Sequence, residues 1–181
     1  HRGPDGYGHT VWDDQNGTRI GFGHRRLSII DLSELGRQPM SKGNWHITYN
    51  GEIYNYKEVK KELLKLGYRF NSDTDTEVIL SAFDEWGTNA IQKFNGMFAF
   101  VIYNSELQKL WLVRDRVGVK PLYIYQKDGL VLFSSELKAF HVLSNIQLNL
   151  NLDSLQLYFQ KGHVPTPNCI FKNCSKLKEG S

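Results

Sequence analysis

Four segments rich in β-branched and aromatic residues decide the fold, and they follow one another along the chain: MFAFVIYN (97–104), KLWLVRD (109–115), PLYIYQK (121–127) and LVLFSSE (130–136). Each segment predicts a strand, and Asp128-Gly129 between the last two is a strong signal for a hairpin turn. The first and last segments are almost continuously apolar, so we expect both faces of these strands to be covered. Sheets stacked on one another, with helices outside, would provide that cover.

The first half of the chain mixes strand and helix signals. Three segments predict strands: TRIGFGHRRLSIID (18–31), NWHITYN (44–50) and YRFNS (68–72). Two helices are expected here, each opened by a capping box, Asn55 with Glu58 and Thr74 with Glu77, and a third, shorter helix is expected from Thr88 to Phe94. Two more are expected in ELKAFHVL (136–143) and LDSLQLYFQKG (152–162). Because strands and helices form separate runs, the sequence predicts the α+β class with mostly antiparallel sheets.

The composition is that of an ordinary globular protein, and it excludes several function classes. The 181 residues are 40% hydrophobic, which suffices for a full core in one domain or slightly more. The 22 Lys and Arg barely exceed the 19 Asp and Glu, so no nucleic-acid partner is expected. No apolar run reaches membrane-spanning length. Cys169 and Cys174 are too few for a disulfide-built fold or a zinc site, which favours a cytoplasmic protein without metal.

Polar residues interrupt the predicted strands and helices at three places. In YNGEIYN (49–55), the Asn50 side-chain amide and the Gly51 N–H can point toward one oxyanion; alternatively, a plain Asn-Gly turn ends the strand. Arg26 either faces solvent or enters a pocket where it would bind a carboxylate. Asp75 either serves only the helix N-terminus or binds an ammonium group. Together Arg26, Glu52 and Asp75 could hold a zwitterionic amino acid.

Seven blocks of sequence carry a resemblance to a known family. In chain order they are HRGPDGYG (1–8), GHRRLSIIDLSELGRQPM (23–40), YNGEIYNYKEV (49–59), SDTDTEVIL (72–80), NGMFAFVIY (95–103), VRDRVGVKPLYIY (113–125) and FSSELKAF (133–140). They resemble the N-terminal class II glutamine amidotransferase domain of glutamine-hydrolysing asparagine synthetases, which is an N-terminal-nucleophile (Ntn) hydrolase. The resemblance implies a four-layer αββα sandwich of two antiparallel sheets that lacks its N-terminal segment. It also implies that the domain spans residues 1–162 and that residues 163–181 are a linker toward a C-terminal ATP-dependent synthetase domain.

The resemblance also implies a reaction and a role for each site residue. An N-terminal Cys thiolate attacks the side-chain amide of glutamine, ammonia leaves, and water releases glutamate from the thioester. The ammonia then passes to an ATP-activated aspartate to make asparagine. Matching the motifs residue by residue assigns the α-carboxylate to Arg26, the oxyanion hole to Asn50 and Gly51, and the α-ammonium to Glu52 and Asp75. The backbone carbonyl of Ile30 would help to hold the substrate.

The nucleophile of the family does not occur in this sequence. The family's Cys begins the mature chain, whereas His1 matches a later position, and Cys169 and Cys174 lie at the opposite end. The 181 residues alone are therefore expected to be inactive. No cofactor is expected in this domain, and ATP and Mg²⁺ are expected in the synthetase domain. The expected partners are L-glutamine, the synthetase domain and a second copy in a homodimer, with no membrane partner.

Two alternatives stay open at this point. The glutaminase could serve another acceptor, such as a sugar in polysaccharide biosynthesis, because the acceptor is chosen outside these residues. The chain could also be a non-catalytic domain that binds glutamine. The presence of Arg26, Asn50, Gly51, Glu52 and Asp75 together argues against loss of catalysis.

Overall fold

A computed structural model describes residues 3–14, 17–27, 34–144 and 146–181. The chain forms two compact units, residues 1–112 and 113–181. The first unit contains strands β1 (Gly6–Asp13), β2 (Arg19–Arg26), β3 (Met40–Lys42), β4 (Trp45–Ile53), β5 (Gly96–Asn104) and most of β6 (Lys109–Arg114). Its helices are α1 (Tyr56–Lys65), α2 (Asp75–Trp86) and α3 (Ala90–Lys93), with 3-10 turns η1 (Glu34–Gly36) and η2 (Gly87–Asn89).

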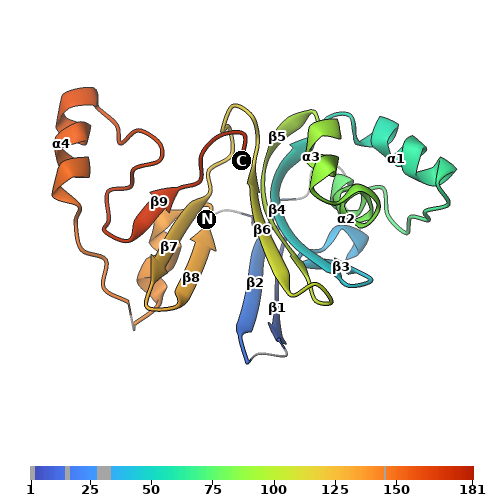
Figure 1. Ribbon diagram of the computed structural model, residues 1–181, viewed down its shortest axis with the longest axis horizontal. Helices are drawn as coiled ribbons and strands as arrows, with labels where there is room; N and C mark the ends of the chain where they lie inside the picture. Colours follow the sequence, from blue (N-terminus) through green and yellow to red (C-terminus); the bar gives the residue numbers. More distant parts are fainter. Residues whose placement is uncertain (1–2, 15–16, 28–33, 145) are drawn as a thin grey trace. The chain divides into compact units, whose positions relative to one another are not determined.

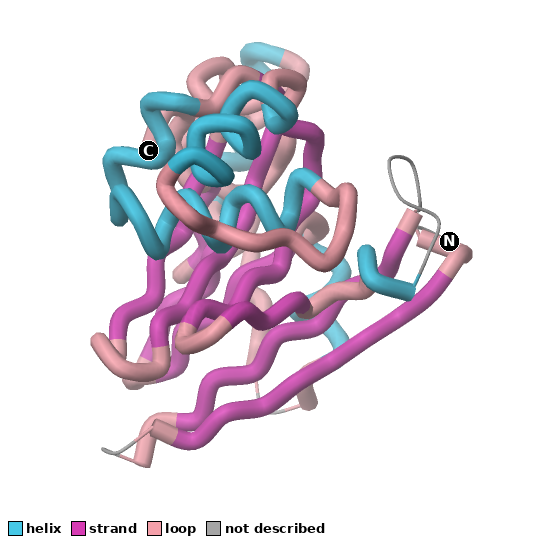
Figure 2. Tube along the Cα trace, turned by 90° about the vertical axis from the view of Figure 1, so that its right-hand side faces the viewer, coloured by secondary structure: helices cyan, strands magenta, loops and turns pink. Residues whose placement is uncertain are grey.

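The first unit is built on a four-stranded sheet with the strand order β3-β4-β5-β6. The helices lie on one side of β4 and β5, and the β1–β2 hairpin lies on the other (Figure 1). Figure 2 shows the hairpin as a long, separate pair of strands. The strand pairs β1–β2, β3–β4 and β4–β5 are antiparallel, which confirms the predicted α+β class with antiparallel sheets.

Side chains alternate between the two faces of the sheet and form two aromatic clusters. On the helix face, Phe83 of α2 meets Phe100 at 5.7 Å and Trp45 at 5.8 Å between ring centroids. On the hairpin face, Trp12 lies 4.5 Å from the ring of His46. Burial of each large apolar side chain contributes roughly 1.5–3 kcal/mol, so these clusters fix β4 between helix and hairpin.

The second unit holds a three-stranded sheet with the order β8-β7-β9, made of β7 (Tyr123–Lys127), β8 (Leu130–Ser134) and β9 (Cys174–Lys176). The turn at Asp128-Gly129 has φ values of 51° and 77° at these two residues, which confirms the predicted hairpin. The predicted helix over 136–143 is a 3-10 helix, η3 (Leu137–Val142), and α4 (Leu152–Lys161) follows it. Strand β9 lies inside the segment predicted to be a linker. The domain boundary at residue 162 stays a prediction.

A loop of the second unit is held by two buried, charged side chains. The Arg114 guanidinium donates hydrogen bonds to the carbonyl groups of Gly118, Lys120 and Leu177. The carboxylate of Asp115, which is 1% exposed, accepts bonds from three backbone N–H groups, those of Val117, Val119 and Lys120. These two residues therefore organise the backbone of this loop.

Two sequence predictions are wrong in the first unit. Residues 68–72 form no strand, because their backbone bonds to side chains: the Arg69 carbonyl accepts from Lys42, and the Asn71 N–H donates to Glu77. The strand expected to end at Asn50 continues to Ile53, so Asn50 and Gly51 lie within β4 and form no turn. None of the helices in the described ranges is long and apolar enough to cross a membrane.

Candidate functional site

The candidate site lies along one edge of β4. Strand β3 pairs with β4 only as far as Ile47, so the rest of this edge is open to side chains. The Gln38 carbonyl Oε1 accepts the Tyr49 N–H at 2.7 Å, and Asp75 Oδ2 accepts the Ile53 N–H at 3.0 Å. Because the backbone of a strand repeats every two residues, the Gly51 N–H points to this same edge. It therefore lies between the bonds made by Gln38 and Asp75.

Asn50 and Glu52 extend from the opposite face of β4 to Tyr49. Thr48 shares their face and donates to the Gly23 carbonyl of the hairpin at 3.3 Å. Both Asn50 and Glu52 are half-buried. The side-chain amide of Asn50 and the backbone N–H of Gly51 thus belong to adjacent residues. Two donors placed in this way can both bind one oxygen atom.

Gly51 is required by the close approach of β5. A Cβ atom here would lie 2.2 Å from the Met97 carbonyl oxygen and 2.6 Å from Phe98 Cα. The φ angle of +155° also disfavours any other residue. Glycine therefore lets β4 carry a donor into the site without separating from β5.

Asp75 is the first residue of α2 and is almost completely buried, with 5% of its surface exposed. Its Oδ2 accepts the Tyr49 hydroxyl at 2.7 Å as well as the Ile53 N–H. Burial raises the pKa of Asp75, although the bonds from Ile53 and Tyr49 oppose that rise. Burial and the charge of Asp75 also raise the pKa of Tyr49, and the charge of Glu52 adds to this effect. Glu52 therefore lies within electrostatic reach of the Tyr49 hydroxyl.

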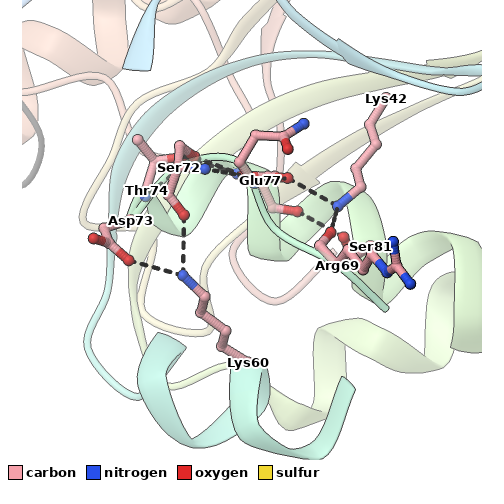
Figure 3. A network of polar contacts seen from close by, with 9 residues as sticks. Lys42, Lys60, Arg69, Ser72, Asp73, Thr74, Glu77 and Ser81 are labelled. Atoms are coloured by element: carbon pink, nitrogen blue, oxygen red, sulfur yellow. Dashed lines mark hydrogen bonds and ion pairs between the residues drawn. The ribbon is translucent and has the colours of Figure 1, made fainter. Parts of the chain in front are cut away.

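The start of α2 is held by a network around Glu77 (Figure 3). Thr74 caps the helix by accepting the Glu77 N–H, as the capping box predicts. The Glu77 carboxylate, however, reaches back beyond Thr74 to the Ser72 N–H at 2.8 Å, and it also accepts from Lys42 Nζ at 2.9 Å. Lys60 bonds the Ser72 carbonyl group and Asp73. The network fixes residues 71–74 and hence the position of Asp75.

Replacing Glu77 with glutamine should lower the free energy of unfolding by about 1–3 kcal/mol at neutral pH, because buried bonds to a charge are lost. Burial raises the pKa of Glu77, but the bonds from Lys42, Ser72 and Asn71 outweigh it and hold the pKa below its usual value. The stabilisation is therefore present above the unfolded-state pKa and is lost as pH falls through the folded one.

Urea unfolding followed by tryptophan fluorescence across pH 3–8 would measure the difference, with Glu58→Gln on the exposed face of α1 as control. The difference in the free energy of unfolding between wild type and Glu77→Gln should become smaller toward acidic pH. A difference in unfolding free energy that does not change with pH would contradict a stabilising charge at Glu77.

Arg26, the last residue of β2, is half-buried beside Gly36. A Cβ atom on Gly36 would lie 2.2 Å from Arg26 Nη2 and 3.2 Å from Thr74 Cγ2. The guanidinium group and the side chain of Thr74, the N-cap of α2, thus both lie next to Gly36. Arg26 also lines a small pocket together with Asp5, Gly6, Tyr7, Glu34, Arg37 and Gln38. This arrangement favours the pocket-facing interpretation of Arg26.

The described residues expected at the site lie at the end of β2, on β4 and at the start of α2. Arg26 lies next to the start of α2, Asp75 bonds β4, and Asn50, Gly51 and Glu52 follow one another on that strand. Ile30 lies outside the described residues. The sequence does not single out Gln38 and Tyr49, although a tyrosine in an apolar strand needs a partner for its hydroxyl. Among the described residues, no three His, Cys, Asp or Glu side chains gather as a metal site would require.

Comparison with known proteins places the chain in a family. The sequence profile of a glutamine amidotransferase domain matches residues 1–181. The chain belongs to this family. A glutamine amidotransferase domain has to recognise an amino acid and a carboxamide, which agrees with the charges and donors along β4.

Two relatives and one solved structure illustrate the similarity. "Asparagine synthetase [glutamine-hydrolyzing] 1" of Bacillus subtilis is 42% identical over 183 residues, which cover 100% of this chain and 28% of the relative. "Putative asparagine synthetase [glutamine-hydrolyzing] 2" of Methanocaldococcus jannaschii is 40% identical over 196 residues, covering 98% of this chain and 37% of the relative. The chain therefore spans about a third of the length of these relatives.

The solved structure of glutamine phosphoribosylpyrophosphate amidotransferase from B. subtilis matches with a TM-score of 0.58 and 24% sequence identity. The matched region covers 67% of this chain and 29% of the chain of the solved structure. The similarity bears out the expected Ntn-hydrolase type of fold.

Proposed function

We propose that this glutamine amidotransferase domain hydrolyses glutamine to glutamate and ammonia within a longer protein. The observation that carries the proposal is the placement of opposite charges at one helix start: the Arg26 guanidinium lies beside Thr74, the N-cap of α2, and the next residue, Asp75, accepts the Ile53 N–H of β4. Arg26 would bind the α-carboxylate, and Asp75 with Glu52 the α-ammonium. The carbonyl of Ile30 would assist. The side-chain carboxamide would then extend toward Asn50 and Gly51.

The chemistry follows from these positions. An N-terminal Cys thiolate would attack the carboxamide carbon, and its own α-amino group would serve as base. The C=O π electrons move onto oxygen, where the Asn50 amide and the Gly51 N–H stabilise the negative charge. The tetrahedral intermediate expels ammonia as the nitrogen takes up a proton. Water then attacks the thioester, which releases glutamate and restores the thiol.

The acceptor of the ammonia would be aspartate, activated by ATP and Mg²⁺ in a C-terminal synthetase domain of the same polypeptide. The proposal is supported by two relatives named as glutamine-hydrolysing asparagine synthetases, of which this chain spans 28% and 37%. We further propose a cytoplasmic location, with which the free thiols of Cys169 and Cys174 agree, and a homodimer. An acceptor such as a sugar is the alternative, and product analysis with each acceptor separates the two.

The first test is release of ammonia from glutamine by the complete protein with its native N-terminus. Release that disappears when the N-terminal Cys is replaced with alanine would support the glutaminase. Glutamine binding without release would instead favour the non-catalytic alternative. No binding would contradict the assigned pocket.

Replacing Arg26 with alanine should raise KM for glutamine by about 10- to 100-fold, because a charge-assisted contact to the α-carboxylate is lost. Asparagine formation from free ammonia should be unchanged, since it bypasses the glutamine pocket. Steady-state kinetics with both nitrogen sources would measure this. Arg25→Ala removes an adjacent, exposed arginine and is the matched control. Equal loss with both nitrogen sources would mean that Arg26 supports the fold instead.

A further inference from the structure

We propose that the Tyr49 hydroxyl is a positioning group for Asp75, and that it sets how well the domain binds the α-ammonium of its substrate. The inference rests on the proposed function and adds one positioning residue to the proposed site. Tyr49 would not touch the substrate. It would act through the carboxylate that does.

The first step is the geometry around one carboxylate oxygen. Asp75 Oδ2 accepts two bonds from β4, the Tyr49 hydroxyl at 2.7 Å and the Ile53 N–H at 3.0 Å. Tyr49 is 4% exposed and Asp75 is 5% exposed, so water does not replace either donor. Tyr49 and Ile53 are four residues apart on β4. Their two bonds hold the position and the rotation of the Asp75 carboxylate.

The second step is the charge of Asp75. Its carboxylate is held by neutral donors, and no salt bridge joins it to a cation within the described ranges. Glu52 of β4 lies within electrostatic reach of the Tyr49 hydroxyl, and Arg26 lies beside Thr74 at the N-cap of α2. Glu77 is turned away toward Lys42. A buried carboxylate without a cation of its own is suited to a cationic ligand, because it would otherwise be costly to keep ionised.

The third step is that the hydroxyl is not needed for packing. The Tyr49 ring packs edge-on against Phe100, with 6.3 Å between centroids. Phenylalanine would preserve that contact. Removing only the hydroxyl would leave Asp75 with the Ile53 bond and a less favourable site for its charge.

The pH dependence follows from this loss. Burial already raises the pKa of Asp75, and the Tyr49 hydroxyl opposes that rise. Without the hydroxyl, the pKa rises further. Binding of the ammonium needs the ionised carboxylate, so the acidic limb of kcat/KM for glutamine should move to higher pH.

The test compares wild type, Tyr49→Phe and Tyr68→Phe in the complete protein with its native N-terminus. Tyr68→Phe is the matched control, because its hydroxyl also donates to an aspartate, Asp84, at 2.9 Å, but at the exposed end of α2. For Tyr49→Phe we expect KM for glutamine to rise about three- to tenfold with kcat nearly unchanged, since one of two bonds is lost. The acidic limb of the kcat/KM profile of Tyr49→Phe should move to higher pH. Tyr68→Phe should have the KM and the pH profile of wild type.

A second ligand separates positioning from a structural role. Glutaramate, which is glutamine without its α-amino group, should inhibit wild type and Tyr49→Phe with equal inhibition constants. Parallel weakening of both ligands, or wild-type KM and pH profile in Tyr49→Phe, would overturn the role of Tyr49 while leaving the glutaminase intact. Absence of glutamine hydrolysis in wild type would instead overturn the proposed function, and this inference with it.

Discussion

Replacing Gly51 with alanine should abolish glutamine hydrolysis and destabilise the protein by about 3–5 kcal/mol, the largest effect expected of any single change here. The added Cβ would meet two backbone atoms of β5, the Met97 oxygen at 2.2 Å and Phe98 Cα at 2.6 Å. Backbone cannot move aside as a side chain can, so β4 and β5 would have to separate. The φ of +155° adds backbone strain of about 1–3 kcal/mol.

Urea unfolding followed by tryptophan fluorescence would measure the loss. Gly43→Ala is the control, because Gly43 also has a positive φ, +57°, but no atom lies within 4 Å of its added Cβ. Gly43→Ala should lower the free energy of unfolding only by the cost of placing alanine at a positive φ angle. If Gly51→Ala and Gly43→Ala unfold at the same urea concentration, the close approach of β5 does not determine this position.

Replacing Asn50 with alanine should lower kcat for glutamine hydrolysis by about 100-fold or more, because one of two donors to the developing oxyanion is lost. KM should change little, since in the proposed site Arg26 and Asp75 would hold the zwitterion. Asparagine formation from free ammonia should be preserved. Steady-state kinetics with glutamine and with ammonia would measure this.

Asn44→Ala provides the control for Asn50. It removes an asparagine at the other end of β4, whose amide donates to the exposed side chain of Glu106 at 2.7 Å. It should leave kcat unchanged. An Asn50→Ala protein with the wild-type rate would remove Asn50 from the oxyanion hole and leave Gly51 as the remaining candidate donor.

Elements with a signal in their own residues could be predicted from the sequence, whereas β1, β3 and β9 could not. The apolar segment of β5 and the Thr74 cap of α2 carry their own local signals. Strands β3 and β9 have three residues each and exist because of their partners. A strand of this length has no periodicity of its own to detect.

Glycine misled the sequence interpretation at Asn50-Gly51, which also fits a plain turn. Gly6 and Gly8 lie in strand β1, for which the sequence analysis predicts no strand. Gly8 lies where a Cβ would meet the Gln38 carbonyl at 2.2 Å, so it marks a close approach of two segments. Gly51 has the same role within β4. In each case the glycine allows tertiary contact, which a local turn signal cannot reveal.

The charged residues assigned to the candidate site carry local signals in the sequence, but the residues that support them do not. Arg26 interrupts an apolar strand pattern, and Asp75 stands at a predicted helix start. Gln38 and Tyr49 matter only because β3 is short and leaves an edge of β4 open. That edge is a property of the assembled sheet, so its covering residues carry no pattern in the sequence.

The open edge of β4 also bears on self-association. Exposed strand edges offer unpaired N–H groups to other chains and promote aggregation. Here the Gln38 amide and the Asp75 carboxylate occupy the N–H groups of Tyr49 and Ile53, so another strand cannot add in register. The same side chains that border the proposed ligand site therefore also protect this edge of β4 from pairing with another strand.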